Sequence, residues 1–225
     1  MRKNLILLGV GTVTFLIFVL FSYLVHKDLF SAIDFDTTVR LQNLIPRRID
    51  QIFSLFSDIG SFEPMLIVLV VALLLWRKFL AGFLLFSSFV AFHVFELFGK
   101  FMVNHPPPPE FMLRTERIIQ FDQFHVRTDF SYPSGHSGRA VMIAFLLIFI
   151  IWQSRLSREV KIILCSLIGV YVMIMLISRV YLGEHWITDV VGGALLAFAL
   201  SCIALSSYNL PLKSVRNKKH HHTEE

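Results

Sequence analysis

The chain has 225 residues, of which 55% are hydrophobic and only 16% are charged. A soluble domain of this length carries more charge, so the composition excludes an ordinary soluble protein and predicts a polytopic membrane protein. The net charge of +5 does not indicate nucleic-acid binding, because no soluble domain is available to carry a basic face.

Six apolar runs divide the chain, and we expect each of them to cross the bilayer as a helix. They are residues 5–25, 62–76, 79–99, 136–152, 162–177 and 187–207. No small-residue cleavage site follows the first run, so we expect an uncleaved span rather than a signal peptide. The predicted fold class is all-α: a single membrane-embedded bundle of six transmembrane helices over residues 1–225, with cytoplasmic tails at 1–4 and 209–225.

Two stretches outside these runs carry signals of their own. Between residues 26 and 61, apolar residues recur at helical spacing opposite polar ones, which predicts a short amphipathic helix. The apolar residues are Ile49, Ile52, Phe53 and Phe56. This helix lies either in the membrane interface or in an ordinary extramembrane helical hairpin. Further along, Pro106–Pro109 favour an extended polyproline II segment, which we interpret as a spacer rather than as a ligand for a partner domain.

The distribution of Lys and Arg predicts the orientation in the membrane. Eleven basic residues and only three acidic ones fall in the two termini and in the loops after the second and fourth runs. The positive-inside rule therefore predicts a plasma-membrane protein with both termini in the cytoplasm and the long loops on the outer face. His220–His222 near the end are too few to indicate a metal site, and we leave them out of the functional interpretation.

One polar stretch, Ser178–Asp189, separates the last two apolar runs. It contains Arg179, Glu184, His185 and Asp189. Ionisable side chains at the edge of a bilayer are costly and mark a functional site by default. If a helix begins near His185, Asp189 lies one turn further along on the same face and can hold the imidazole in one tautomer. The alternative is a polar loop in which this histidine and aspartate merely pair at the membrane surface.

Two further groups are expected at the same outer edge. Lys100 shares a helical face with Glu96 and His93, so this face is expected to look into the bundle. Pro133–His136 opens the fourth span, where Gly135 lets backbone amides approach an anion and the helix dipole favours negative charge. Together these groups suit a phosphate ester better than a carboxylic ester, and the sequence has no Gly-x-Ser-x-Gly elbow.

These residues and their order resemble the type 2 phosphatidic acid phosphatase superfamily, and in particular the bacterial phosphatidylglycerophosphate phosphatase B type. The signature of that family has three parts: Lys-x6-Arg-Pro, Pro-Ser-Gly-His and Ser-Arg-x5-His-x3-Asp. The second part matches at 133–136 and the third at 178–189. The resemblance covers about residues 50–205.

The first part of the signature is incomplete in this chain. Seven residues after Lys100, where the family carries Arg, this sequence has Pro107. Arg139, one turn beyond His136, is our first candidate to supply the missing cation, although a snorkelling interface residue is an equal alternative. Further candidates come from the long loop: His105, Arg114 and Arg117.

The resemblance implies a role for each site residue. His185 would attack phosphorus and become phosphohistidine, while Asp189 would orient it and stabilise its charge. His136 would protonate the leaving oxygen and then activate the hydrolytic water. The phosphoryl oxygens would be held by Lys100, Ser134, the Gly135 amide, Arg179 and, as an added candidate, Arg139.

The expected activity is hydrolysis of a phosphomonoester or pyrophosphate of a membrane lipid. Phosphatidylglycerophosphate is favoured as the substrate, and undecaprenyl pyrophosphate is also considered. Besides the lipid and the bilayer, no nucleic acid and no obligate protein partner are implied. No cofactor or metal is expected, because the acids of the long loop are irregularly spaced; they are Glu110, Glu116, Asp122 and Asp129. The competing hypotheses are a membrane transporter that uses the same ionisable residues and a lipid-phosphate-binding protein without turnover.

Overall fold

The computed structural model describes residues 2–76, 79–115 and 129–208, and within these residues the chain is helical with no strand. The elements are α1 (Arg2–His26), α2 (Ser31–Leu44), η1 (Arg47–Ile49), α3 (Asp50–Ile59), α4 (Phe62–Trp76), α5 (Phe79–Met102), η2 (Glu110–Met112), α6 (Gly135–Gln153), α7 (Arg158–Tyr181) and α8 (Ile187–Tyr208). The elements η1 and η2 are short 3-10 helices.

The predicted spans all occur as helices. Five of them, in α1, α5, α6, α7 and α8, are long and apolar enough to cross a membrane by themselves. The helix α4 has only 15 residues, but with the preceding η1 and α3 it forms a pair bent by 53° that counts as a sixth candidate span. The apolar runs form helices because backbone groups in a bilayer core have no water to bond and must satisfy one another within the segment.

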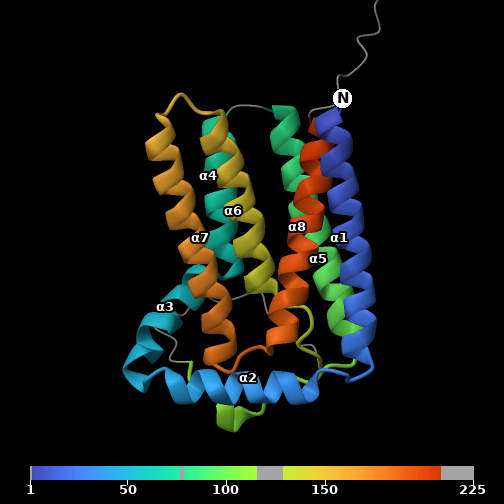
Figure 1. Cartoon of the computed structure of the whole chain (residues 1–225), viewed down its shortest axis with the longest axis vertical. Helices are drawn as coiled ribbons and strands as arrows, with labels where there is room; N and C mark the ends of the chain where they lie inside the picture. Colours follow the sequence, from blue (N-terminus) through green and yellow to red (C-terminus); the bar gives the residue numbers. More distant parts are fainter. Residues whose placement is uncertain (1, 77–78, 116–128, 209–225) are drawn as a thin grey trace, which may run out of the picture.

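The bundle is built around α8. Helix α1 packs along α8, which also contacts α5 and α6, while α6 packs on α7 (Figure 1). Phe92, Tyr132 and Leu196 are completely buried in its interior. Large apolar side chains such as Phe79 and Ile163 are exposed on its outside, as expected where lipid rather than water is the solvent.

Helix α2 lies across one end of the bundle, transverse to the spans (Figure 1). It contacts α7 and α8 there. The start of α1, the end of α8 and the turn between α6 and α7 all lie at the opposite end. The distribution of Lys and Arg places these same segments together on one side of the membrane. That this side is the cytoplasm stays a prediction.

The amphipathic helix predicted between residues 26 and 61 is α3, but its polar face is the buried one. Helix α3 buries Ser54, Ser57 and Asp58 and leaves Ile52 and Leu55 exposed. In a membrane bundle the apolar face of such a helix can meet lipid, which frees the polar face to line a polar site inside. That α3 lies in the membrane interface stays a prediction.

The proline segment connects α5 to η2 without regular secondary structure. Pro109 has φ −65° and ψ 150°, which is polyproline II geometry. The carbonyl of Pro106 accepts a hydrogen bond from Nε1 of Trp186 at 2.8 Å. The segment is therefore fixed against the chain that leads into α8.

Candidate active site

A His–Asp pair forms at the start of α8. The turn before it requires Gly183, whose φ is +69° and whose hypothetical Cβ would lie 2.3 Å from the carbonyl oxygen of Met112. After this turn, Nδ1 of His185 lies 3.2 Å from Oδ2 of Asp189. The backbone N–H of Trp186 donates to the same oxygen at 3.1 Å. Asp189 thus caps the first turn of α8 and orients the imidazole, which leaves Nε2 of His185 available for chemistry.

The environment of His185 keeps its imidazole neutral. Burial lowers the pKa of His185 well below its usual value of 6.5, and the nearby charges of Arg179 and Lys100 lower it further. A neutral imidazole is the form that can act as a nucleophile or a base. The electrostatics therefore agree with the geometry of the pair.

The N-terminus of α6 meets the same site. The N–H of Ser134 donates to the carbonyl oxygen of Asp189 at 2.9 Å, which ties the second motif to the third. Ser134 caps α6 by accepting from the N–H of Ser137 at 3.5 Å. A Cβ on Gly135 would lie 2.0 Å from Oε1 of Glu96. Glycine is therefore needed for a carboxylate to approach this helix end so closely.

His136, the second residue of α6, is half-buried beside the site. Four groups act on it electrostatically, in decreasing order Arg179, Arg139, His185 and Lys100. The structure therefore brings the two histidines and the three basic residues into one cluster.

Each of the three cations has a carboxylate partner. Nζ of Lys100 lies 3.1 Å from Oε1 of Glu96, and Nη1 of Arg139 lies 3.8 Å from its Oε2. Arg179 pairs with Glu184 and donates to the hydroxyl of Ser57. An anionic phosphate that binds these cations would therefore compete with Glu96 and Glu184 for them.

The candidates for the missing cation differ in where they lie relative to the cation cluster. Arg139 is 6% exposed and lies in the cation cluster, where its Nε donates to the carbonyl of Gly60 at 3.3 Å. His105 instead faces Asp189 from the side away from His185. Nη1 of Arg114 donates to the hydroxyl of Tyr181 at 3.2 Å. Arg117 lies outside the described residues. The geometry favours Arg139 and does not support a snorkelling role for it.

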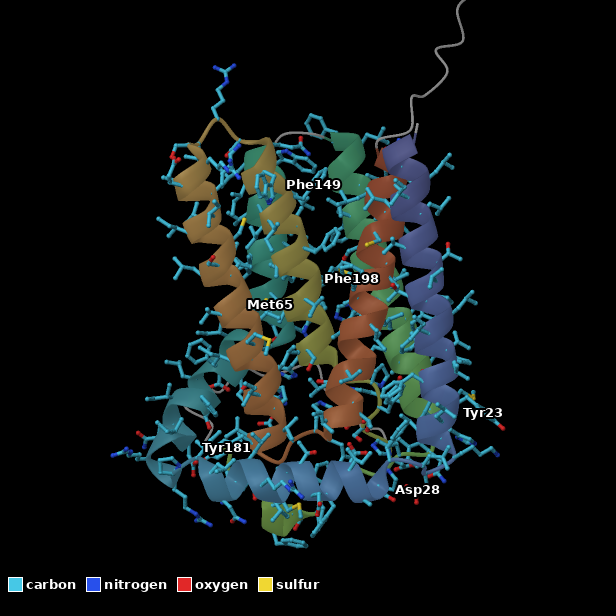
Figure 2. The ribbon with its side chains drawn as sticks, in the orientation of Figure 1. Tyr23, Asp28, Met65, Phe149, Tyr181 and Phe198 are labelled. Atoms are coloured by element: carbon cyan, nitrogen blue, oxygen red, sulfur yellow. The ribbon has the colours of Figure 1, made fainter. Side chains whose placement is uncertain are left out.

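Tyr181 marks a polar corner that links the site to α2 and α3. Its hydroxyl donates to Asp50 of α3, and its carbonyl accepts from Nε2 of Gln42 in α2 at 2.9 Å. Figure 2 shows Tyr181 at the end of α7 that adjoins these two helices. Sequence reasoning missed this corner, although the polar face of the amphipathic helix was a signal for its α3 half.

Asp34 of α2 was also missed. It is 1% exposed and accepts hydrogen bonds from the N–H and the hydroxyl of Thr188, at 3.0 and 2.8 Å. Burial raises the pKa of Asp34 to about 6. Asp34 and Thr188 are separated by 154 residues, so no local sequence pattern could have predicted their contact.

The described residues contain no group of three or more His, Cys, Asp or Glu side chains that could hold a metal ion. Of the loop acids, Glu116 and Asp122 lie outside the described residues. The absence of a metal and of a cofactor stays a prediction.

Comparison with known proteins finds partial matches to curated lipid phosphatases. Phosphatidylglycerophosphatase B of Bacillus subtilis strain 168 is 36% identical over 96 residues, which is 40% of this chain and 45% of that protein. Phosphatidylglycerophosphatase B of Escherichia coli K12 is 35% identical over 97 residues, 42% of this chain and 36% of that protein. The E. coli K12 protein named "Putative undecaprenyl-diphosphatase YbjG" is 36% identical over 86 residues, 38% of each chain. The chain thus spans less than half the length of these curated relatives.

Two solved structures share the fold. The crystal structure of a transmembrane PAP2 type phosphatidylglycerolphosphate phosphatase from Bacillus subtilis aligns with a TM-score of 0.72 at 21% identity, over 92% of this chain and 98% of that one. Aquifex aeolicus LpxE aligns with a TM-score of 0.56 at 22% identity, over 77% of this chain and 94% of that one. The all-α, multi-pass membrane bundle is therefore confirmed.

A model of the PAP2 superfamily matches residues 78–211, more than half of the sequence. The matched region contains both ends of the candidate site, from Lys100 to Asp189. The chain therefore belongs to the PAP2 superfamily.

Proposed function

We propose that this protein is an integral-membrane lipid phosphatase that hydrolyses a phosphomonoester or pyrophosphate of a membrane lipid through a phosphohistidine intermediate. The observation that carries this proposal is the pair of His185 and Asp189, 3.2 Å apart, beside a cluster of three cations. The pairing at Nδ1 leaves Nε2 of His185 as the nucleophile. Membership of the PAP2 superfamily and the names of the curated relatives support the same activity.

In the first step, Nε2 of His185 attacks phosphorus while the bond from phosphorus to the leaving oxygen breaks. His136, protonated at this stage, gives its proton to the leaving oxygen. Asp189 stabilises the positive charge that develops on the His185 ring. Lys100, Arg139 and Arg179 neutralise the charge on the phosphoryl oxygens, helped by the Ser134 hydroxyl and the Gly135 amide at the positive end of α6.

In the second step, the phosphohistidine is hydrolysed. His136, now neutral, takes a proton from a water molecule whose oxygen attacks phosphorus. The bond from phosphorus to Nε2 of His185 breaks, which releases inorganic phosphate and restores the imidazole. A positioned acid or base of this kind contributes about 10² to 10⁴ in rate.

The outer surface of the bundle supports a lipid substrate. An apolar groove between α6 and α7 is lined by residues that include Val141, Phe145 and Ile177. Val141 lies two residues beyond Arg139, and Ile177 two residues before Arg179. A lipid tail lying in this groove would therefore reach the level of these two cations along α6 and α7.

For the substrate we favour phosphatidylglycerophosphate, because two of the relatives are named phosphatidylglycerophosphatase B. Undecaprenyl pyrophosphate is the second candidate, and the name of the YbjG relative favours it. We further propose one membrane-embedded unit over residues 1–225 in the plasma membrane, with both termini in the cytoplasm and the active site on the outer face. The uneven distribution of Lys and Arg supports this orientation.

Phosphate release from detergent-solubilised protein without added metal tests the activity. We expect the wild type to release phosphate from lipid phosphates and His185→Ala to release none. The matched control is His26→Leu, because His26 lies at the end of α1 and outside the cation cluster. A labelled, acid-labile phosphoprotein should be trapped in the wild type and be absent from His185→Ala. Equal release by both proteins would remove His185 from the mechanism. Comparing kcat/KM across lipid phosphates and pyrophosphates then identifies the substrate.

A further inference from the structure

A buried polar cluster lies on the side of Asp189 that faces away from His185. It joins Asp34 of α2, His105 of the loop after α5, and Thr188 and Asp189 of α8. None of these four residues is more than 5% exposed. The ring of Tyr132 packs edge-on against that of His105, with centroids 6.4 Å apart. The proposed mechanism uses Asp189 but none of the others.

The hydrogen bonds of Thr188 locate one proton in this cluster. Its Oγ1 lies 2.8 Å from Oδ2 of Asp34 and 3.1 Å from Nε2 of His105. An ionised carboxylate only accepts, so the single hydroxyl hydrogen of Thr188 goes to Asp34. The hydroxyl oxygen must then accept from His105. Nε2 of His105 therefore carries a hydrogen.

The same nitrogen of His105 also lies close to the carboxylate of Asp189, in ion-pair contact. Nε2 lies 3.5 Å from Oδ1 of Asp189 and 3.5 Å from Oδ2 of Asp34. Oδ1 of Asp189 is buried and has no hydrogen bond of standard geometry among the described residues. The side chain of Ser131 is also a hydrogen-bonding partner of Asp189, and the charges of His105 and Lys100 act on the carboxylate electrostatically. A buried carboxylate oxygen needs such stabilisation, because a buried charged group without a partner costs free energy.

The orientation of Asp189 depends on both of its oxygens. Oδ2 accepts from Trp186 and faces Nδ1 of His185. If Oδ1 were not held, the carboxylate could rotate about its χ2 bond, which has a broad energy profile. Rotation would weaken the contact that selects the His185 tautomer with Nε2 free. A fixed donor at Oδ1 prevents this.

We propose that His105 is a positioning residue of the reaction: its Nε2–H holds Oδ1 of Asp189, so that Oδ2 stays directed at His185. Asp34 and Thr188 hold His105 in place in turn. This links α2, which lies across the end of the bundle, to the nucleophile. The inference rests on the proposed function, in which Asp189 and His185 act together.

Two substitutions of His105 test the proposal. His105→Leu removes the donor, whereas His105→Gln can keep an N–H near the same place. The matched control is His26→Leu, because Nδ1 of His26 accepts from the N–H of Asn104 at 3.1 Å. That control disturbs the same loop, one residue away, without touching Asp189.

We expect His105→Leu to lower kcat about 10- to 100-fold with KM within about threefold of wild type, since His105 acts through Asp189 and does not touch the phosphate. His105→Gln should recover most of the loss, and His26→Leu should stay within about twofold of wild type. In an Asp189→Asn background, His105→Leu should cost less than about threefold more. An unchanged kcat, a loss confined to KM, or full additivity with Asp189→Asn would overturn the proposal.

The His185 tautomer gives a readout that needs no turnover. In protein labelled with ¹⁵N-histidine, the His185 signals are those lost in His185→Ala. We expect Nδ1–H alone in the wild type and in His26→Leu, and a mixture of tautomers in His105→Leu. A single Nδ1–H tautomer in His105→Leu would overturn the proposal. A tautomer change in a protein that hydrolyses no lipid phosphate would refute the proposed function and leave the positioning role standing.

Discussion

Replacement of Arg139 by Gln tests whether this arginine supplies the cation that Pro107 cannot. The guanidinium is held from two sides, by Glu96 at 3.8 Å and by the carbonyl of Gly60 at 3.3 Å. It is therefore aimed into the site rather than at lipid headgroups. Arg139→Gln keeps a polar side chain of smaller reach and removes one of the three positive charges near His185.

The expected loss follows from the chemistry of the transferred phosphoryl group. Removing one preorganised donor aimed at a developing oxyanion costs about 2.7 to 4 kcal/mol, or about 10² to 10³ in kcat. We expect a loss of this size, because the guanidinium is buried and solvent cannot take its place. Arg139→Lys keeps the positive charge but lacks the planar guanidinium with its fixed donor geometry. Its kcat should therefore fall between those of wild type and Arg139→Gln.

The assay is phosphate release at saturating and limiting lipid phosphate, compared with Arg158→Gln, whose side chain is exposed at the start of α7. Restoring the family residue with Pro107→Arg in the Arg139→Gln protein should recover at least about tenfold in kcat. Pro107 follows Pro106, whose carbonyl binds Trp186 next to His185. A kcat/KM of Arg139→Gln within about threefold of wild type would refute the reasoning.

Three further predictions concern the local packing, the pH dependence and metal ions. Gly135→Ala should lower the thermal unfolding midpoint in detergent by an amount equivalent to about 1–3 kcal/mol, because its Cβ would lie 2.0 Å from Oε1 of Glu96. The control Gly9→Ala, where a Cβ meets nothing within 4 Å, should not lower the midpoint, and equal midpoints for the two variants would contradict the packing argument. In the proposed mechanism activity needs His185 in its neutral form, and the neutral form is lost as the pH falls through the pKa of His185. Because burial and the charge of Arg179 hold that pKa well below 6.5, the acid limb of kcat/KM should lie below pH 6.5 once the substrate's own ionisation, followed by ³¹P titration, is accounted for. A midpoint at or above 6.5 would contradict this. Chelation of divalent cations should leave the rate of phosphate release unchanged; a loss that Mg²⁺ or Zn²⁺ restores would show that a metal takes part.

The positions of the apolar helices could be predicted from hydropathy alone. The run 62–76 coincides with α4, and the run 187–207 differs from α8 by one residue at its end. This agreement has a simple cause, because an apolar segment of this length in a bilayer has helix as its accessible regular structure. The pairing of His185 with Asp189 could be predicted from their spacing, since residues four apart share a helix face.

The periodicity of α3 could not say which of its faces is buried. In water the apolar face would turn inward, but here Ser57 faces inward and binds Arg179, while Ile52 faces outward. The sequence pattern is the same in both cases. Only packing against α7 decided the direction.

The residues that hold Asp189 on the side away from His185 could not be predicted from any local sequence pattern. Sequence reasoning assigned no role to Asp34, and it considered His105 only as a loop residue that could bind phosphate. The crossing of α2 beneath α8 places Asp34 on Thr188, 154 residues away, and leaves His105 between two buried carboxylates. The sequence by itself thus determined the helices and indicated the candidate reacting groups, because both follow from spacing along one segment. The tertiary structure alone decided which partners orient those groups, because such contacts join segments whose separation in the chain carries no signal.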